Sequence, residues 1–396
     1  MANTREVVIV NGVRTAIGDY GGSLKDLPPT ELGARVVREA LKRANVDPAQ
    51  VGQCVFGNVI HTEARDMYLS RVAAINGGLP HESGALTVNR LCGSGLQAIV
   101  SASQYIMLGD TDAAIGGGAE SMSRAVYANL TQRWGARMGD NKIIDMMVGA
   151  LTDPFDTVHM GVTAENVANR CGITREQQDA FAVESHRRAT VAATEGRFKS
   201  QILPVELKSK KGVTQFDTDE HVRSDATSEG MAKLRAVFAK ENGTVTAGNA
   251  SGLNDAAAAV VLMEEDAARR GGFTPMARLV SYGHAGVEPR LMGLGPVTAV
   301  KNALAKARLS LGDIDIIESN EAFAAQALGV NQELGLDPAK VNPNGGAVAL
   351  GHPIGATGCI LTVKAMYELQ RTGKRYALIT MCIGGGQGIA AIIERV

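Results

Sequence analysis

The chain has 396 residues, of which 45% are apolar and 20% are charged, and its formal net charge is -1. This length exceeds one ordinary core, so we expect two or three domains, and the near-zero charge excludes a general electrostatic attraction to nucleic acid. The five cysteines are scattered, odd in number and never in a CxxC pair, which argues against a disulfide framework and a metal site. With no signal-peptide pattern and no long apolar run, we expect a cytoplasmic protein without membrane contacts.

Short apolar runs alternate with helical patterns in the first 121 residues. The predicted elements are a strand over 6–12, a helix over 31–45, a strand over 54–60, a helix after Gly93 and a strand over 111–118. In the first helix Thr30 is the expected N-cap, and Pro48 lies beyond the end. This alternation is typical of the α/β class.

The segment from about 122 to 250 has a different character, with more charge and more turn-forming residues. TREQ (174–177) matches a capping box and predicts a helix start, whereas 199–228 predicts solvated loops or a β-hairpin. We interpret the segment as an insertion that covers one face of the remaining chain. The apolar run AAAAVVLM (256–263) would then return the chain to the first α/β unit.

Two parts of the chain resemble each other. Residues 43–58 align without a gap with 306–321, at an offset of 263, and at the same offset GSG (93–95) aligns with ATG (356–358). Each of these helix starts leads to a strand that is expected to end in GGG, at 116–118 and 384–386. The pattern indicates two copies of one α/β unit.

Cys92 lies directly before Gly93-Ser94-Gly95 and a predicted helix. At the positive end of the helix dipole its pKa is expected to fall, which would favour the thiolate. The glycines remove side chains where a substrate carbonyl would approach sulfur and backbone N–H donors. Cys92 is therefore a candidate nucleophile, although an arbitrary cysteine is more often an inert buried one.

Three further residues add chemistry to this thiol. His352, held between Gly351 and Pro353, is a candidate base, and a Cys/His pair indicates acyl transfer without defining the reaction. Cys382, in TMCIGGGQG, could remove a proton from a carbon acid whose enolate is held by donors such as the Gly384 N–H. Asn320, at the end of an apolar run, could fix a water or donate to an oxyanion. Neither glycine run has the GxGxxG order of a dinucleotide site.

Taken together, these motifs resemble the thiolase family over essentially the whole chain. They are VNRLCGSGLQAIVSASQYIMLG, GGGAESMS, TAGNASGLNDAAAAVVLM, NEAFAAQ, NPNGGAVALGHPIGATG and TMCIGGGQG. The resemblance implies a duplicated five-layer α/β/α/β/α sandwich with an inserted loop domain. The expected division is 1–121 plus 253–274 for the N-terminal half, 122–252 for the loop domain that binds coenzyme A, and 275–396 for the C-terminal half.

The resemblance also implies a role for each catalytic residue. Cys92 corresponds to the nucleophile that becomes S-acylated, His352 to its base, and Cys382 to the acid/base that serves the α-carbon of the second acetyl-CoA. Asn320, through a water, and His352 would line one oxyanion hole, and the N–H groups of Cys92 and Gly384 would form the other. Metal ions and cofactors are not implied, because coenzyme A thioesters are the substrates.

The coenzyme site follows from the same resemblance. HMGVTAENVA (159–168) matches a pantetheine-contacting segment whose His-Met pair is similar to that of short-chain enzymes. The residues expected to contact the coenzyme or its acyl group are His159, Met160, Arg223, Leu234, Phe238, Ala250, Ser251 and Phe323. For Arg223 a solvated surface charge is an equal alternative. Gly230 stands where some family members have a hydroxyl residue, which makes the nucleotide contacts less secure.

The implied activity is the reversible Claisen condensation of two acetyl-CoA to acetoacetyl-CoA and coenzyme A. A broader short-chain 3-ketoacyl-CoA thiolase is the alternative. A decarboxylating condensing enzyme of the same fold would have Cys-His-His or Cys-His-Asn, and a non-catalytic carrier would be expected to lack one of the four catalytic side chains. A cysteine hydrolase would release acetate. The resemblance implies a homo-oligomer, a dimer or a dimer of dimers, with 126–140 as candidate tetramerising loop.

Overall fold

The computed structural model describes residues 5–210 and 212–396, so residues 1–4 of the predicted N-terminal half lie outside the described chain. Its main sheet has the strand order β13-β14-β15-β12-β1-β11-β5-β3-β4. The strands of the N-terminal half are β1 (Val7–Thr15), β3 (Gln53–Gly57), β4 (Gly84–Val88), β5 (Ala113–Ser121) and β11 (Asn254–Glu264). Those of the C-terminal half are β12 (Ala277–Gly286), β13 (Ile316–Ser319), β14 (Tyr376–Ile383) and β15 (Gln387–Arg395).

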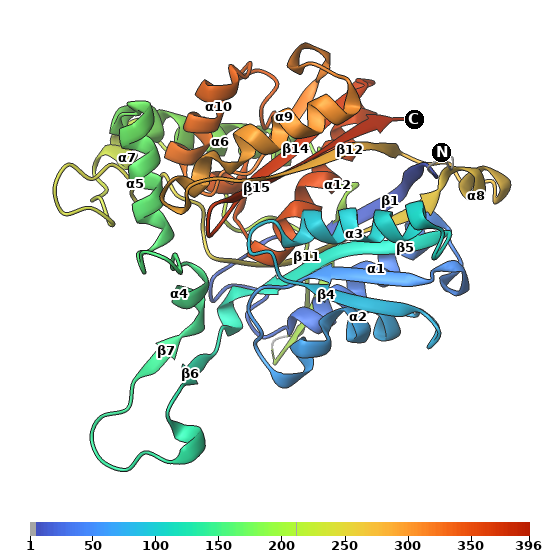
Figure 1. The fold of residues 1–396 in the computed structure, drawn as a ribbon, viewed down its shortest axis with the longest axis horizontal. Coiled ribbons are helices and arrows are strands. Elements are labelled where there is room, and N and C mark those ends of the chain that lie inside the picture. The colour runs from blue at the N-terminus through green and yellow to red at the C-terminus, as the bar shows by residue number, and fades with distance from the viewer. Residues whose placement is uncertain (1–4, 211) are drawn as a thin grey trace.

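The two halves meet at a short seam. Strand β1 pairs with β12 through Val8 and Ile9 alone among the described residues, against Arg278 and Ala277. On either side of the seam the strands form the two sheets of the sandwich, each with its own helices (Figure 1). The protein is therefore built as two packed sheets that share one narrow connection.

Helices form the other three layers. Helices α1 (Pro29–Ala44) and α2 (Leu69–Gly77) cover the outer face of the N-terminal sheet, and α9 (Gly295–Ala307) covers that of the C-terminal sheet. Helices α3 (Ser94–Leu108) and α12 (Ile354–Thr372) pack on each other, and α12 contacts strands of both halves. The expected α/β/α/β/α order is confirmed, with α3 and α12 in the centre.

The internal repeat is also confirmed. Strands β3 and β13 begin at residues 53 and 316, and β5 and β14 begin at 113 and 376, so each pair is 263 residues apart. Strand β11 pairs with both β1 and β5, which returns the chain to the first half as expected.

Two details of the sequence interpretation are wrong. The glycine runs are not equivalent: Gly116–Gly118 lie inside β5, whereas Gly384–Gly386 form the turn between β14 and β15, with φ of 80° and 86° at the last two. The N-cap of α1 is Pro28 rather than Thr30, because Pro29 occupies the first helical position, where a missing N–H costs nothing.

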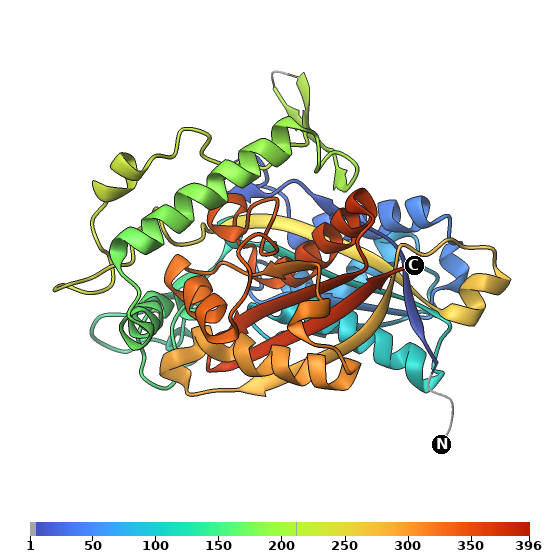
Figure 2. The same cartoon turned by 90° about the horizontal axis from the view of Figure 1, so that it is seen from above.

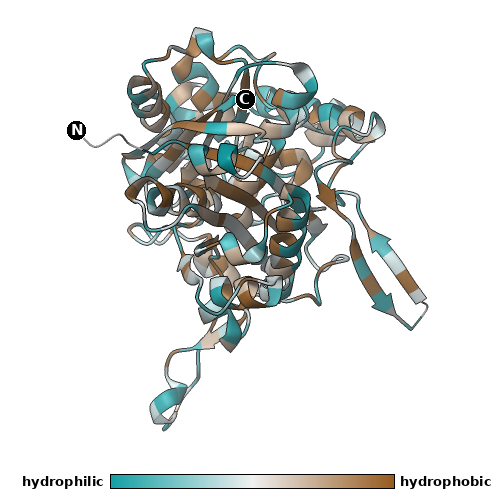
Figure 3. Cartoon of the chain, turned by 90° about the vertical axis from the view of Figure 1, so that its right-hand side faces the viewer, coloured by the Kyte–Doolittle hydropathy of each residue, from teal (hydrophilic) through white to brown (hydrophobic). Residues whose placement is uncertain are grey.

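The inserted region contains helices, hairpins and an extended arm. Thr174 caps α6 (Arg175–Thr194) in the predicted capping box, and α6 lies along one side of the molecule (Figure 2). The predicted hairpin is β9 (Val205–Ser209) with β10 (Gly212–Phe216). Strands β6 (Tyr127–Asn129) and β7 (Ile143–Asp145) form an arm that projects far from the core (Figures 1 and 3). The remaining helices are α4 (Met146–Ala150), α5 (Met160–Cys171), α7 (Ser228–Ala232), α8 (Glu265–Arg270), α10 (Ala324–Leu334) and α11 (Ala347–Leu350).

The inserted region is tied to the first strand by a buried ion pair. Arg14 in β1 donates to both carboxylate oxygens of Asp219 at 2.7 and 2.9 Å, and both side chains are almost fully buried. Asp219 also accepts the N–H of Ile17. The pair fixes where the returning segment crosses the N-terminal half. None of the described helices is both long and apolar enough to cross a membrane.

Candidate active site

The first turns of α3 and α12 pack with almost no space between them. A Cβ atom added to Gly95 would lie 2.8 Å from the backbone nitrogen of Cys359, and one added to Gly358 would lie 2.3 Å from the backbone nitrogen of Leu96. Real Cβ atoms do not approach so closely, so only glycine allows this crossing. Because Cys92 precedes α3 and His352 precedes α12, the crossing brings the two side chains into one site.

Cys92 lies in a tight turn between β4 and α3. Leu91, the residue before it, has φ of 45°, which is strained for a leucine. The turn is closed by backbone bonds from the N–H of Gly93 to the carbonyl of Arg90 and from the N–H of Ser94 to that of Leu91. This conformation directs the thiol away from the helix and toward the cavity described below, which Cys92 lines.

The thiol of Cys92 has a raised pKa, contrary to the expectation from the helix dipole. Burial raises it to about 11, and the backbone N–H groups of Gly384 and of Cys92 itself oppose that rise. The charge of the buried Glu120 adds to the rise. Removal of water therefore outweighs the donors around the sulfur, so a base must take the proton. The Gly384 N–H is one of these donors, so it lies beside the Cys92 sulfur.

His352 is buried and held in one tautomer. The Thr357 hydroxyl donates to the carbonyl of Pro353 at 2.9 Å, so its oxygen accepts from Nδ1–H of His352 at 2.7 Å. Nε2 is then left without a proton and lies 3.5 Å from Nδ2 of Asn320. Burial lowers the pKa of His352 to about 4, so the ring is neutral near pH 7 and Nε2 can accept a proton.

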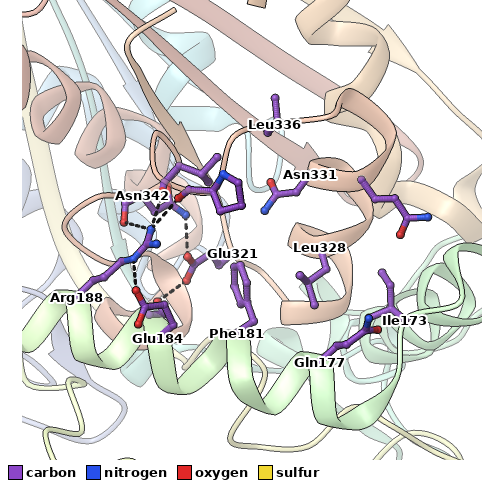
Figure 4. Close-up of a pocket in the computed structure, with 14 residues that line it drawn as sticks. Ile173, Gln177, Phe181, Glu184, Arg188, Glu321, Leu328, Asn331, Leu336 and Asn342 are labelled. Carbon is purple, nitrogen blue, oxygen red and sulfur yellow. Dashed lines mark hydrogen bonds and ion pairs between the residues drawn. The ribbon is translucent and has the colours of Figure 1, made fainter.

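Asn320 is held from both sides of its backbone. It follows β13, and its N–H donates to the carbonyl of Thr380 in β14. The next residue, Glu321, accepts from Ser185 Oγ and Asn342 Nδ2, each at 2.7 Å, beside a separate pocket of about 380 Å³ between α6 and α10 (Figure 4). These contacts fix the turn that presents the Asn320 amide to His352. Its Oδ1 is buried and accepts no hydrogen bond from the described residues.

Cys382 lies close enough to Cys92 for the Cys92 sulfur to raise its pKa. It is fully buried near the end of β14 and packs with Met160, Ala322 and Phe323. Its pKa lies well above the ordinary value, first because of burial and then because of the Cys92 sulfur. The two thiols from opposite ends of the chain therefore share one site.

A largely apolar cavity of about 510 Å³ opens beside these groups. Cys92, His352 and Gly384 line it, whereas Cys382 and Asn320 are not among its lining residues. Six of the residues predicted to contact the coenzyme or its acyl group also line it: His159, Met160, Phe238, Ala250, Ser251 and Phe323.

The walls of the cavity come from the inserted region and from the segment NEAF (320–323). The ring of His159 stacks on Phe238 with centroids 4.7 Å apart, and Phe238 meets Phe323 edge to face. The N–H of Ser251 donates to the carbonyl of Ala322, and Ala250 pairs with Phe323 in an isolated bridge. Burial lowers the pKa of His159, so this ring offers a neutral surface.

The structure does not place two of the predicted coenzyme residues on the cavity. Arg223 is exposed and forms an ion pair with Asp19 at 3.8 Å, and Leu234 is partly exposed near Gly248. Both remain predictions. The sequence interpretation missed Thr357, which orients His352, and the methionines Met122, Met147 and Met292, which line the cavity with Met160. Isolated methionines and threonines carry no spacing pattern that could have identified them.

A thiol with a neutral imidazole, two amide donors and a second thiol is a set that suits acyl transfer with carbon–carbon bond formation. Family models agree with that class: the thiolase N-terminal domain matches residues 7–266 and the thiolase C-terminal domain matches 273–395. The chain belongs to the thiolase family.

Individual relatives cover the chain completely or nearly so. It is 69% identical to the β-ketothiolase BktB of Cupriavidus necator over 99% of this chain and 100% of that protein. The crystal structure of the Bacillus anthracis acetyl-CoA acetyltransferase superposes with a TM-score of 0.98 at 44% identity, covering 100% of both chains. Human mitochondrial 3-ketoacyl-CoA thiolase in complex with CoA gives a TM-score of 0.96 at 45% identity, with coverage of 100% and 99%.

The protonation of the Cys92–His352 pair can be measured by alkylation. With the thiol pKa raised to about 11 and the imidazole pKa lowered to about 4, the pair is neutral between these values. The rate of Cys92 alkylation by iodoacetamide should therefore rise roughly tenfold per pH unit from about pH 6 to pH 9, because the thiolate fraction rises so. Peptide mass spectrometry would follow Cys92, with Cys92→Ser as background. An alkylation rate that does not change between pH 5 and pH 8 would instead indicate a thiolate–imidazolium pair.

Proposed function

We propose that the protein catalyses the reversible condensation of two acetyl-CoA to acetoacetyl-CoA and coenzyme A through an S-acetyl intermediate on Cys92. The observation that carries this proposal is that Cys92 and His352 line a single cavity while the buried Cys382 lies close enough to Cys92 to feel its charge. A hydrolase needs one thiol and a water, so it would have no use for Cys382 as a base.

In the first half-reaction, Nε2 of His352 takes the proton of Cys92, and the sulfur attacks the thioester carbonyl. The N–H groups of Cys92 and Gly384 stabilise the oxyanion that forms. When the carbon–sulfur bond of the thioester breaks, the coenzyme leaves with the proton of Cys382. The enzyme is then acetylated on Cys92, with an imidazolium at His352 and a thiolate at Cys382.

In the second half-reaction, the Cys382 thiolate removes a proton from the methyl group of a second acetyl-CoA. The enolate oxygen is stabilised by the His352 imidazolium and by a water held on Asn320, whose Oδ1 is free to accept a hydrogen bond. The carbanion attacks the acetyl group, and the Cys92 sulfur leaves and recovers its proton from His352. Each side chain ends in its starting protonation state.

Two variants separate the roles of the thiols. Cys92→Ser should form no acyl-enzyme, because a serine hydroxyl in this environment is a far weaker nucleophile. Cys382→Ser should still become acetylated yet produce acetoacetyl-CoA at least about 10²-fold more slowly, because only its proton-transfer role is lost. Intact-protein mass spectrometry after addition of acetyl-CoA measures the first, and acetoacetyl-CoA formation the second. Ordinary turnover by Cys92→Ser would refute the assignment, and release of acetate alone by the wild type would indicate a hydrolase.

The broader substrate range is supported by the character of the cavity wall. Met122, Met147, Met160 and Met292 line it, and thioether side chains adapt to different shapes. The relative with 69% identity is named as a β-ketothiolase. We propose that ketoacyl chains longer than C4 enter the same site. Arg223 would lie near the adenine nucleotide and Leu234 would pack against the coenzyme.

Thiolysis of C4, C5 and C6 ketoacyl-CoA tests this range. The C5 and C6 rates should lie within about tenfold of the C4 rate, because the methionine side chains of the wall can move aside for the added methylenes. Met292→Phe, which adds volume to a buried wall, should slow the C6 substrate more than the C4 substrate. A drop of more than a hundredfold from C4 to C5 would restrict the enzyme to acetoacetyl-CoA.

We propose a dimer of dimers in which the arm joins the dimers. Trp134 is 91% exposed and Met138 is 99% exposed, which is unusual for large apolar side chains and marks a contact surface. Strand β4 is the edge of the main sheet and carries the partly exposed Leu86, which supports pairing with a second copy.

Replacement of both Trp134 and Met138 by serine should reduce the assembly from four chains to two at micromolar concentration, because the apolar contact is lost. Light scattering coupled to size exclusion measures the mass. Leu108→Ser removes an apolar side chain that is 80% exposed at the end of α3 and should leave the mass unchanged. An unchanged mass in the double variant would exclude the arm as the joint.

The predicted division of the chain also remains a proposal, with an N-terminal half of 1–121 and 253–274, a loop domain of 122–252 and a C-terminal half of 275–396. It is supported by the ends of β5 at Ser121 and of the insertion just before β11 at Asn254. The five free cysteines support a reducing compartment, which we propose is the cytoplasm.

A further inference from the structure

The two donors of the proposed oxyanion hole at Cys92 come from segments that are far apart in the chain. One is the N–H of Cys92, before α3, and the other is the N–H of Gly384, between β14 and β15. Apolar contacts hold the segments together: a Cβ on Gly93 would lie 2.6 Å from Cδ1 of Ile383, and one on Gly384 would lie 3.0 Å from Cδ1 of Leu91. Such contacts press the segments together but are not directional, so they do not fix how far one can slide along the other.

Arg90 supplies directional contacts between these segments. Its Nη1 donates to Oε1 of Gln97 in α3 at 2.6 Å, and its Nη2 donates to Oε1 of Gln387 at 3.2 Å. Gln387 is the first residue of β15, directly after the glycine turn. The Arg90 backbone N–H donates to Oγ of Ser94, whose hydroxyl donates to the carbonyl of Leu91. Arg90 thus links the turn that holds Cys92, helix α3 and the glycine turn 384–386.

Gln97, one of the two acceptors of Arg90, is held by a second donor. Oε1 of Gln97 also accepts from Nε2 of His284 in β12, at 3.1 Å. Burial, with the charges of Arg90 and Lys306, lowers the pKa of His284 to about 4, so the ring is neutral and its Nε2 carries a proton when it donates. The Gln97 carbonyl is therefore held by one donor from each half of the protein.

The partners of Arg90 indicate a geometric role. Both are neutral amide oxygens, and no carboxylate of the described residues lies within ion-pair distance of this half-buried guanidinium. A charge kept for folding alone would be expected to pair with an acid. The planar fork of arginine reaches two acceptors at a fixed angle, which a lysine ammonium cannot do.

Building on the proposed function, we propose that Arg90 is a positioning residue that sets the spacing of the Cys92 and Gly384 amide donors by linking Gln97 to Gln387. A change in this spacing would weaken the stabilisation of the oxyanion while leaving the coenzyme cavity in place, since Arg90 does not line it. The effect belongs to the chemical step rather than to binding.

The test measures thiolysis of acetoacetyl-CoA by Arg90→Met, Arg90→Lys, Gln387→Leu and the double variant Arg90→Met with Gln387→Leu. We expect kcat to fall about tenfold to hundredfold with KM within about twofold, because misplaced donors cost transition-state stabilisation. Arg90→Lys should behave like Arg90→Met, and the double variant should lose no more than the single ones. Cys92 alkylation by iodoacetamide should fall by clearly less than kcat, because the Gly384 N–H is only one of the groups that set the pKa of the Cys92 thiol, and burial, the largest cause, is unchanged.

Arg71→Met is the matched control. Arg71 also donates from Nη1 and Nη2 to neutral oxygens, the carbonyls of Ser83 and His81, but far from the glycine turn. The kcat of Arg71→Met should remain near that of the wild type.

Four results would overturn the proposal: kcat of Arg90→Met within about threefold of wild type, full activity of Arg90→Lys, additive losses in the double variant, or a loss of alkylation as large as the loss of kcat. A wild-type enzyme that forms and cleaves no acetoacetyl-CoA would instead refute the proposed function, which the parallel wild-type assay detects.

Discussion

The close approach of α3 and α12 is the constraint on which the site depends. Glycine at 95 and 358 lets the first turns of these helices touch backbone to backbone, where any side chain would meet main-chain atoms. Each helix begins directly after one member of the Cys92–His352 pair. A displacement of about 1 Å between the helices would be enough to cost about a hundredfold in rate, so the packing of the centre layer and the chemistry cannot be separated.

Burial then determines the electrostatics. It raises the pKa of both thiols and lowers that of the imidazole, so three groups that could carry charge all rest in their neutral forms. Hydrogen bonds decide which atoms react: Thr357 occupies Nδ1 of His352 and leaves Nε2 for the proton. Backbone N–H groups oppose the rise in the Cys92 pKa that burial causes. They do so at the sulfur, which carries negative charge when it attacks in the proposed acyl transfer. Charge therefore appears only when substrate is present to take it up.

The sequence was a good guide to fold order and to which residues come together in the candidate site. The 263-residue offset predicted the two halves because apolar spacing survives where side-chain identity does not. Cys92, His352, Asn320, Cys382 and Gly384 stand in long motifs, and the structure brings all five together. The thiol pKa was predicted with the wrong sign, because the local dipole is visible in the sequence but the removal of water by distant segments is not.

Other features could not be predicted from the sequence, for related reasons. Gly116–Gly118 and Gly384–Gly386 read alike as letters, yet one run packs inside a strand and the other turns the chain, which depends on what lies against them. Thr357 acts on His352 through one rotamer of its hydroxyl. Arg90 joins Gln97 to Gln387, residues nearly three hundred positions apart, and only the assembled halves place them within reach of one side chain.

The raised pKa of Cys92 has a consequence outside the catalytic cycle. Peroxide and similar oxidants attack thiolates, and a sulfur that keeps its proton at neutral pH offers them little of that form. At neutral pH the resting Cys92 sulfur is thus poorly reactive toward such oxidants, and under the proposed mechanism it becomes reactive only when a thioester binds.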